Sequence, residues 1–205
     1  MYRYASLGFA ATGAAFLLYP AARPWGDETT LTGAAGMAST QWVVAHLSAV
    51  AGFIALTLAL LALHDLLRSR TARAALLTTW IGVALTLPYY GAEVFGVHEA
   101  AAQALREHDA ALLVRMTDAI RYQPAAATMF ALGLATIAAG AILTAAAIAA
   151  RWNRWTGVPM AAGFALFIPQ FFAGAPLRIA HGALIALGCA WVAVALLRAG
   201  SAPRR

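Results

Sequence analysis

The chain has 205 residues, of which 62% are hydrophobic and only 11% are charged. Soluble domains are closer to half apolar, so this excess, gathered in long blocks, excludes an ordinary soluble domain and predicts a polytopic membrane protein. The formal net charge of +6 includes no lysine, because all fourteen basic residues are arginine. In a membrane protein such charges mainly set topology, so we expect membrane lipids and not nucleic acid as partners.

Six stretches are long and apolar enough to cross a bilayer, because about 20 apolar residues span its hydrocarbon core. They cover approximately residues 4–21, 41–64, 74–97, 125–150, 156–174 and 177–198. Short segments rich in Arg, Pro, Gly and polar residues separate them. The sequence therefore predicts an all-α fold in which residues 1–205 form a single domain of six transmembrane helices.

The arginines are distributed unevenly between the two sides of this arrangement. The side that holds both termini has Arg3, Arg68, Arg70, Arg73, Arg151, Arg154, Arg198, Arg204 and Arg205. The opposite side has Arg23, Arg106, Arg115, Arg121 and Arg178. Because arginines in short loops favour the cytoplasmic side, we predict a multi-pass protein of the cell membrane with both termini in the cytoplasm.

The longest connection, residues 98–124, is amphipathic. Apolar side chains recur at helical spacing, at Leu105, Leu112, Leu113, Met116 and Ile120. Charged side chains occupy the other faces. This pattern predicts an external amphipathic helix at the membrane interface, which acts either as a lid over a membrane pocket or as a plain connector.

Two prolines lie inside predicted spans, each a few residues before the outer end. Pro88 precedes the stretch YYGAEVFG, which contains Glu93, and Pro169 precedes Gln170 and two phenylalanines. A proline removes one backbone hydrogen bond and kinks a helix. Kinks at matching depth in two helices predict a cavity between them.

Polar side chains from several spans should meet at this depth. The outer ends of the second, third, fifth and sixth spans carry His46, Glu93, Gln170, Arg178 and His181. Ionisable groups inside a bilayer are costly and usually face the interior of a bundle or a water-filled cavity. Each also has a plainer interpretation. In that interpretation, Glu93 only forms a structural ion pair with Arg178 or His181, and His46 only forms a contact between two helices.

A carboxyl group among apolar side chains can remain protonated near neutral pH and act as a general acid. Aromatic faces stabilise a cationic intermediate, and a dry pocket protects that cation from water. The aromatic candidates for such a wall are Trp42, Trp80, Tyr89, Tyr90, Phe95, Phe171 and Phe172. Trp25, Trp152 and Trp155 fit an interfacial belt better than a pocket. Glu93 beside the candidate rings suits proton-initiated cyclisation of a lipid-soluble isoprenoid chain.

The chain resembles the small integral-membrane terpene cyclases of terpenoid-hybrid natural-product pathways. The resemblance rests on its size, its bundle of short-looped helices and the membrane carboxylate within PYYGAEVFG. It implies that Glu93 donates a proton to an alkene or epoxide and that Tyr90, His46 or His181 orients or reprotonates it. We expect substrate contacts from Trp42, Trp80, Tyr89, Phe95, Gln170, Phe171 and Arg178. Neither a metal nor a cofactor is expected.

Other functions fit the same residues. His46 and His181, at similar depth on parallel helices, suit the axial positions of a haem, which would be non-covalent because the sequence lacks a C-x-x-C-H motif. Alternatively, Glu93 and Arg178 form the substrate or proton site of a transporter or binding protein for a small amphipathic molecule. A purely structural membrane protein is the plainest alternative.

Overall fold

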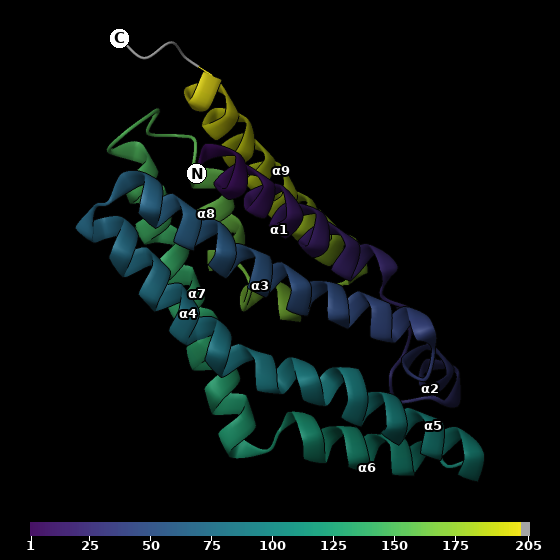
Figure 1. The fold of residues 1–205 in the computed structure, drawn as a ribbon. Coiled ribbons are helices and arrows are strands. Elements are labelled where there is room, and N and C mark those ends of the chain that lie inside the picture. Colours follow the sequence, from purple (N-terminus) through teal and green to yellow (C-terminus); the bar gives the residue numbers. More distant parts are fainter. Residues whose placement is uncertain (202–205) are drawn as a thin grey trace.

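The computed structural model describes residues 1–201, and every regular element in that range is helical. Four helices are long and apolar enough to cross a membrane, namely α1 (Tyr2–Ala22), α3 (Thr40–Leu67), α7 (Pro124–Ala149) and α9 (Ala175–Ser201). Together with α4 (Arg70–Gly91) they form an elongated bundle (Figure 1). The prediction of an all-α fold is confirmed, and the four apolar helices indicate a protein that spans a membrane.

The bundle helices approach one another closely where small residues meet. α1 packs against both α3 and α9, and α4 packs along α7. A Cβ atom added to Gly82 of α4 would lie 2.7 Å from the carbonyl oxygen of Gly133 in α7, so this crossing requires glycine. Elsewhere Phe16 fills the core with edge-to-face contacts to Phe53 at 4.8 Å and to Phe164 at 5.3 Å.

α4 has the length of a membrane span, but its arginines, threonines and tyrosines keep its hydropathy below that of the four apolar helices. It continues without interruption through a π-helix, Ala92–Val97, into α5, His98–Glu107. Pro88 cannot donate a backbone hydrogen bond, and the wider π turns begin one helical turn after it. The helical run changes direction between α4 and α5 (Figure 1), as the proline predicted, yet it extends ten residues beyond the predicted span.

Residues 98–124 form two antiparallel helices and not the single amphipathic helix that we predicted. α5 ends at His108, which adopts a left-handed φ of 53°. Asp109 then caps α6 (Ala110–Arg121) by accepting a hydrogen bond from the amide of Leu112 at 2.9 Å. A left-handed terminal residue followed directly by an N-cap aspartate reverses the chain.

α2 (Leu31–Met37), the π-helix, α5 and α6 pack together at one end of the bundle, and we call this region the cap (Figure 1). Its own apolar core contains Met37, Trp42, Val97 and Leu113, all fully buried. The apolar face of α6 therefore packs against protein at Leu113, where the sequence had suggested contact with lipid.

The predicted fifth span, residues 156–174, is also broken. α8 covers only Val158–Ala165, and a 3-10 helix, Pro169–Phe172, follows it. Ala165 lies four residues before Pro169, so its carbonyl group receives no hydrogen bond there, and the α-helix ends at that residue. This broken segment, packed between α7 and α9, returns the chain to the end of the bundle where α9 begins.

Candidate ligand-binding site

A cavity of about 750 Å³ lies where the bundle meets the cap. Its charged lining residues are Arg23, Glu28, Glu93, Arg121 and Arg178. Its aromatic lining residues are Tyr19, Trp25, Tyr89, Tyr90, Tyr122, Phe130, Phe171 and Phe172, with His46 beside them. These side chains come from the ends of α1, α4 and α6, from the beginnings of α3, α7 and α9, from the π- and 3-10 helices, and from the connection between α1 and α2. The helix termini thus build one polar and aromatic site.

One wall of the cavity is aromatic. The rings of Tyr89 and Phe130 are stacked with their centroids 4.1 Å apart. Phe130 also contacts Phe171 at 5.6 Å and Tyr90 at 6.1 Å. Such a wall offers several π faces to a flat or elongated apolar ligand.

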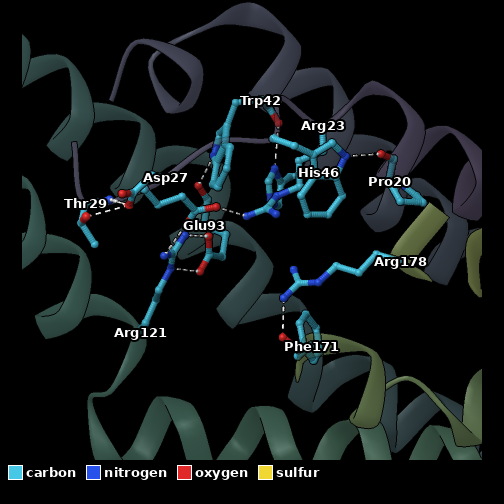
Figure 2. Close-up of polar contacts among 12 residues, drawn as sticks. Pro20, Arg23, Asp27, Thr29, Trp42, His46, Glu93, Arg121, Phe171 and Arg178 are labelled. Carbon is cyan, nitrogen blue, oxygen red and sulfur yellow. Dashed lines mark hydrogen bonds and ion pairs between the residues drawn. The ribbon is translucent and has the colours of Figure 1, made fainter. Parts of the chain in front are cut away.

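Another part of the cavity lining is a chain of largely buried ion pairs (Figure 2). The Nε of Arg121 donates to Oε1 of Glu93 at 2.7 Å, and its Nη2 donates to Oε2 at 3.0 Å. Its Nη1 donates to Oε2 of Glu28 at 2.7 Å, and the other oxygen of Glu28 accepts from Arg23. The two-pronged contact with Glu93 is the geometry of a carboxylate bound to a guanidinium.

Two members of this chain of ion pairs, Glu28 in the connection after α1 and Arg121 in the cap, are strongly held in their charged forms. Burial acts to raise the pKa of Glu28, but Arg23 and Arg121 outweigh it, and the net pKa lies below its ordinary value. Burial likewise acts to lower the pKa of Arg121, but its bonds and charge interactions with Glu93 and Glu28 raise the pKa well above its ordinary value. Both groups are therefore ionised at neutral pH.

Hydrogen bonds from α3 position the backbone of the π-helix. The indole N–H of Trp42 donates to the backbone oxygen of Glu93 at 2.8 Å, across 51 residues of sequence (Figure 2). The Nδ1 of His46 lies 2.8 Å from the backbone oxygen of Trp42. Because a carbonyl oxygen only accepts, Nδ1 carries the proton and Nε2 is left as a hydrogen-bond acceptor. The rings of Trp42 and His46 contact each other with centroids 4.2 Å apart and planes tilted by 37°.

Arg178 enters the cavity from the first turn of α9. Its Nε donates to the backbone oxygen of Ala173 at 3.0 Å, and its Nη2 donates to that of Phe171 (Figure 2). Its guanidinium carbon lies 5.4 Å from the ring centroid of Trp25. The guanidinium carbon of Arg23 lies 4.5 Å from the same centroid. Trp25 therefore has a cationic group near it from each of two helices.

Tyr90 is buried against the cavity, and its hydroxyl forms no hydrogen bond with any residue in the range 1–201. Tyr19 lies beside Tyr90, with ring centroids 5.9 Å apart, but the two hydroxyl groups do not meet hydrogen-bond geometry. A buried hydroxyl is usually satisfied, so this unpaired atom is an exception in the packing beside the cavity.

The structure brings six of the predicted site residues to the cavity, namely His46, Tyr89, Tyr90, Glu93, Phe171 and Arg178. Trp42 supports the site from behind through its bond to Glu93. Gln170 and His181 line a separate space of about 10 Å³, and the Nε2 of His181 donates to the backbone oxygen of Gly163.

Four expectations about placement are wrong. Trp80 and Phe95 are 44% and 64% exposed on the outer surface, because the buried face of this helical run includes Thr86, Tyr90 and Glu93. Trp25 lines the cavity and is not confined to an interfacial belt. The ion-pair partner of Glu93 is Arg121, where the sequence suggested Arg178 or His181.

The sequence did not single out Arg23, Glu28, Arg121 or Phe130 as site residues. Glu28 and Arg23 lie in or next to the connection after α1, and Phe130 lies in an alanine-rich span. The available signal was the number of charged residues at the outer helix ends, which is unusual beside an apolar bundle. No protein-family model matches the sequence, and no curated protein and no solved structure matches this chain.

Proposed function

We propose that this chain is a membrane protein that binds a lipid-soluble, amphipathic small molecule in the cavity between bundle and cap. The observation that carries the proposal is the cavity itself. It measures about 750 Å³, and its lining includes both stacked aromatic rings and a chain of ion pairs. Pockets for small ligands typically enclose about 300–1,000 Å³ and combine apolar walls with a few placed polar groups.

The proposed membrane arrangement has six crossings, with both termini in the cytoplasm of the cell. The four apolar helices provide four crossings, α4 provides the third, and the broken segment of α8 and the 3-10 helix provides the fifth. The start of α1 and the end of α9 lie together, since Gly200 packs against Tyr2, as an even number of crossings requires. The cap and the cavity then lie toward the outer face.

Filling the cavity tests the binding function. Ala131 lines the cavity from α7, whereas Ala135, one turn further along the same face of the helix, is exposed and does not line the cavity. We expect wild-type protein and Ala135→Trp to retain the same small molecule, or to take up an added farnesol probe, in native mass spectrometry. Ala131→Trp should lose it. Binding that survives Ala131→Trp, or wild-type protein that holds neither kind of molecule, contradicts the proposal.

A second candidate function is proton-initiated cyclisation of an isoprenoid, favoured by the position of Glu93 on the same cavity as Tyr89, Tyr90 and Phe130. Glu93 would first have to accept a proton and leave Arg121. Its O–H bond then breaks as an alkene electron pair forms a C–H bond, and a carbocation results beside the aromatic wall. A proton lost from the final cation to the carboxylate of Glu93, either directly or by way of the Nε2 of His46, restores the acid and completes the cycle.

Cyclisation has a distinctive isotope signature. A farnesylated phenol incubated with the protein in D₂O should give a cyclic product with one added deuterium, and Glu93→Gln should abolish it. Glu99→Gln, which removes an exposed carboxylate of the cap, is the matched control. Full activity of Glu93→Gln would rule out the acid assignment. No contact favours haem binding, because His46 and His181 line different spaces.

A further inference from the structure

The charged lining of the cavity is not balanced. Its two carboxylates have all four oxygens engaged, because both oxygens of Glu93 bind Arg121 and those of Glu28 bind Arg121 and Arg23. Arg178 has no carboxylate partner among residues 1–201, and its recorded bonds use only backbone carbonyls. The three arginines and two glutamates on the cavity surface therefore leave one excess positive charge.

This excess charge is concentrated around Trp25. The guanidinium groups of Arg23 and Arg178 both lie within 5.4 Å of the Trp25 ring, and the indole is fixed by a bond to the backbone oxygen of Pro20 at 3.0 Å. Arg23 is 9% exposed, and its Nε has no hydrogen-bond acceptor in the part of the chain that the structure describes. Glu28 balances Arg23, but no described carboxylate balances Arg178, so a further anion beside the two guanidinium groups would offset their repulsion at low dielectric.

Arg178 is also held in the cavity and does not simply extend toward water. Its bonds to the carbonyl groups of Phe171 and Ala173 tie the guanidinium to the 3-10 helix, 5.5 Å from the Phe171 ring. A guanidinium has five N–H donors, and these two bonds leave others for a ligand. Carboxylate and phosphate groups match such donors in shape and charge.

We propose that Arg23 and Arg178 bind the oxyanion head group, a carboxylate or a phosphate monoester, of a single-chain amphiphile. Its apolar chain then lies along the aromatic wall formed by Tyr89, Phe130 and Phe171. This inference rests on the proposed function, since it names the chemical class of the molecule that the cavity binds. An oxyanion head group would make the ligand an acidic lipid and not a neutral isoprenoid.

The test compares three probes that share one chain. The full-length protein in nanodiscs of zwitterionic lipid is titrated with dodecanoate, dodecyl phosphate and dodecanol, and tryptophan fluorescence reports binding. We expect one or both anions to bind about tenfold more tightly than dodecanol, as charge-assisted bonds predict. The difference between dodecanoate and dodecyl phosphate identifies the preferred head group.

Arginine variants then locate the preference. Arg178→Gln should remove the advantage of the anions and leave dodecanol affinity unchanged, while Arg178→Lys should retain part of it. Arg106→Gln removes one positive charge from the exposed face of α5 and should change nothing. Equal affinity for all three probes in wild-type protein, or a preference that survives Arg178→Gln, overturns the head-group assignment. If Ala131→Trp also leaves every probe's affinity unchanged, the proposed cavity function fails as well.

Discussion

The bundle and the cap bury their polar groups in opposite ways. At the crossing of α4 and α7, glycines let the two backbones approach, and the hydroxyl of Thr86 bonds within its own helix, to the carbonyl of Gly82 at 2.8 Å. Where the cap meets the bundle, buried arginines and glutamates bond across 93 residues of sequence. Close packing without charge holds the first region, and paired charge holds the second.

The difference shows where this molecule can bind a ligand. A glycine crossing leaves no space between helices, whereas the ion pairs stand at a junction where the helices end and spread. Side chains there come from separate elements, and the cavity lies between them. The comparison therefore predicts that changes at the junction affect both stability and ligand binding, while changes at the crossing affect stability alone.

Removing Arg121 should have the largest effect. Arg121→Gln leaves Glu93 and Glu28 without their shared partner, and the side chains of Arg121 and Glu93 are only 19% and 11% exposed. Loss of one partner from a buried pair costs about 3–5 kcal/mol. We expect a fall of that size in the free energy of unfolding, measured by circular dichroism in detergent micelles.

The matched control for this change lies on the same helix. Arg115 is 64% exposed and lies 3.5 Å from Asp109, so Arg115→Gln should cost less than about 1 kcal/mol. The double variant Arg121→Gln with Glu93→Gln should recover part of the loss, because it removes one of the unpaired charges. Similar losses for Arg121→Gln and Arg115→Gln would show that the buried chain of ion pairs does not hold the cap.

Local sequence patterns predicted the helices and the layer of polar residues, but not the partner of Glu93. Hydrophobic length indicated the four apolar helices, and Pro88 indicated the change of direction after α4. In one straight helix, the 28 residues between Glu93 and Arg121 would separate them by about 42 Å. The reversal at His108 and Asp109 brings them together. A left-handed histidine depends on the whole cap, so residue spacing alone could not predict it.

A change at the glycine crossing should have the next largest effect. Gly82→Ala places a Cβ atom against the backbone of Gly133, so we expect a loss of about 1–3 kcal/mol. Gly91→Ala, on the same helix, meets no atom within 4 Å and should stabilise the protein by up to about 1 kcal/mol. Ligand affinity should not change in Gly91→Ala. Unchanged stability in Gly82→Ala would contradict the close approach of α4 and α7.

Acidification should have the smallest effect, and at the junction it should act through Glu28. Burial acts to raise the pKa of Glu28, but Arg23 and Arg121 together lower it by more than burial raises it. The net folded pKa therefore lies below the ordinary value of 4.5. The stabilisation is therefore fully present above pH 4.5 and is lost as the pH falls through the lowered folded pKa. The melting temperature of wild-type protein should fall in that range.

Glu28→Gln separates this contribution from general acid damage. The variant should melt at a lower temperature than wild type at pH 7, and the difference between the two proteins should shrink as the pH falls below 4.5, because protonated Glu28 also lacks the charge. Glu99→Gln, whose ion pair with Arg106 is solvent-exposed, should follow the wild-type curve throughout. A gap between Glu28→Gln and wild type that stays constant at every pH would mean that Glu28 contributes by its shape and not by its charge. The contrast between a neutral bundle and a charged junction would then have to be abandoned for this residue.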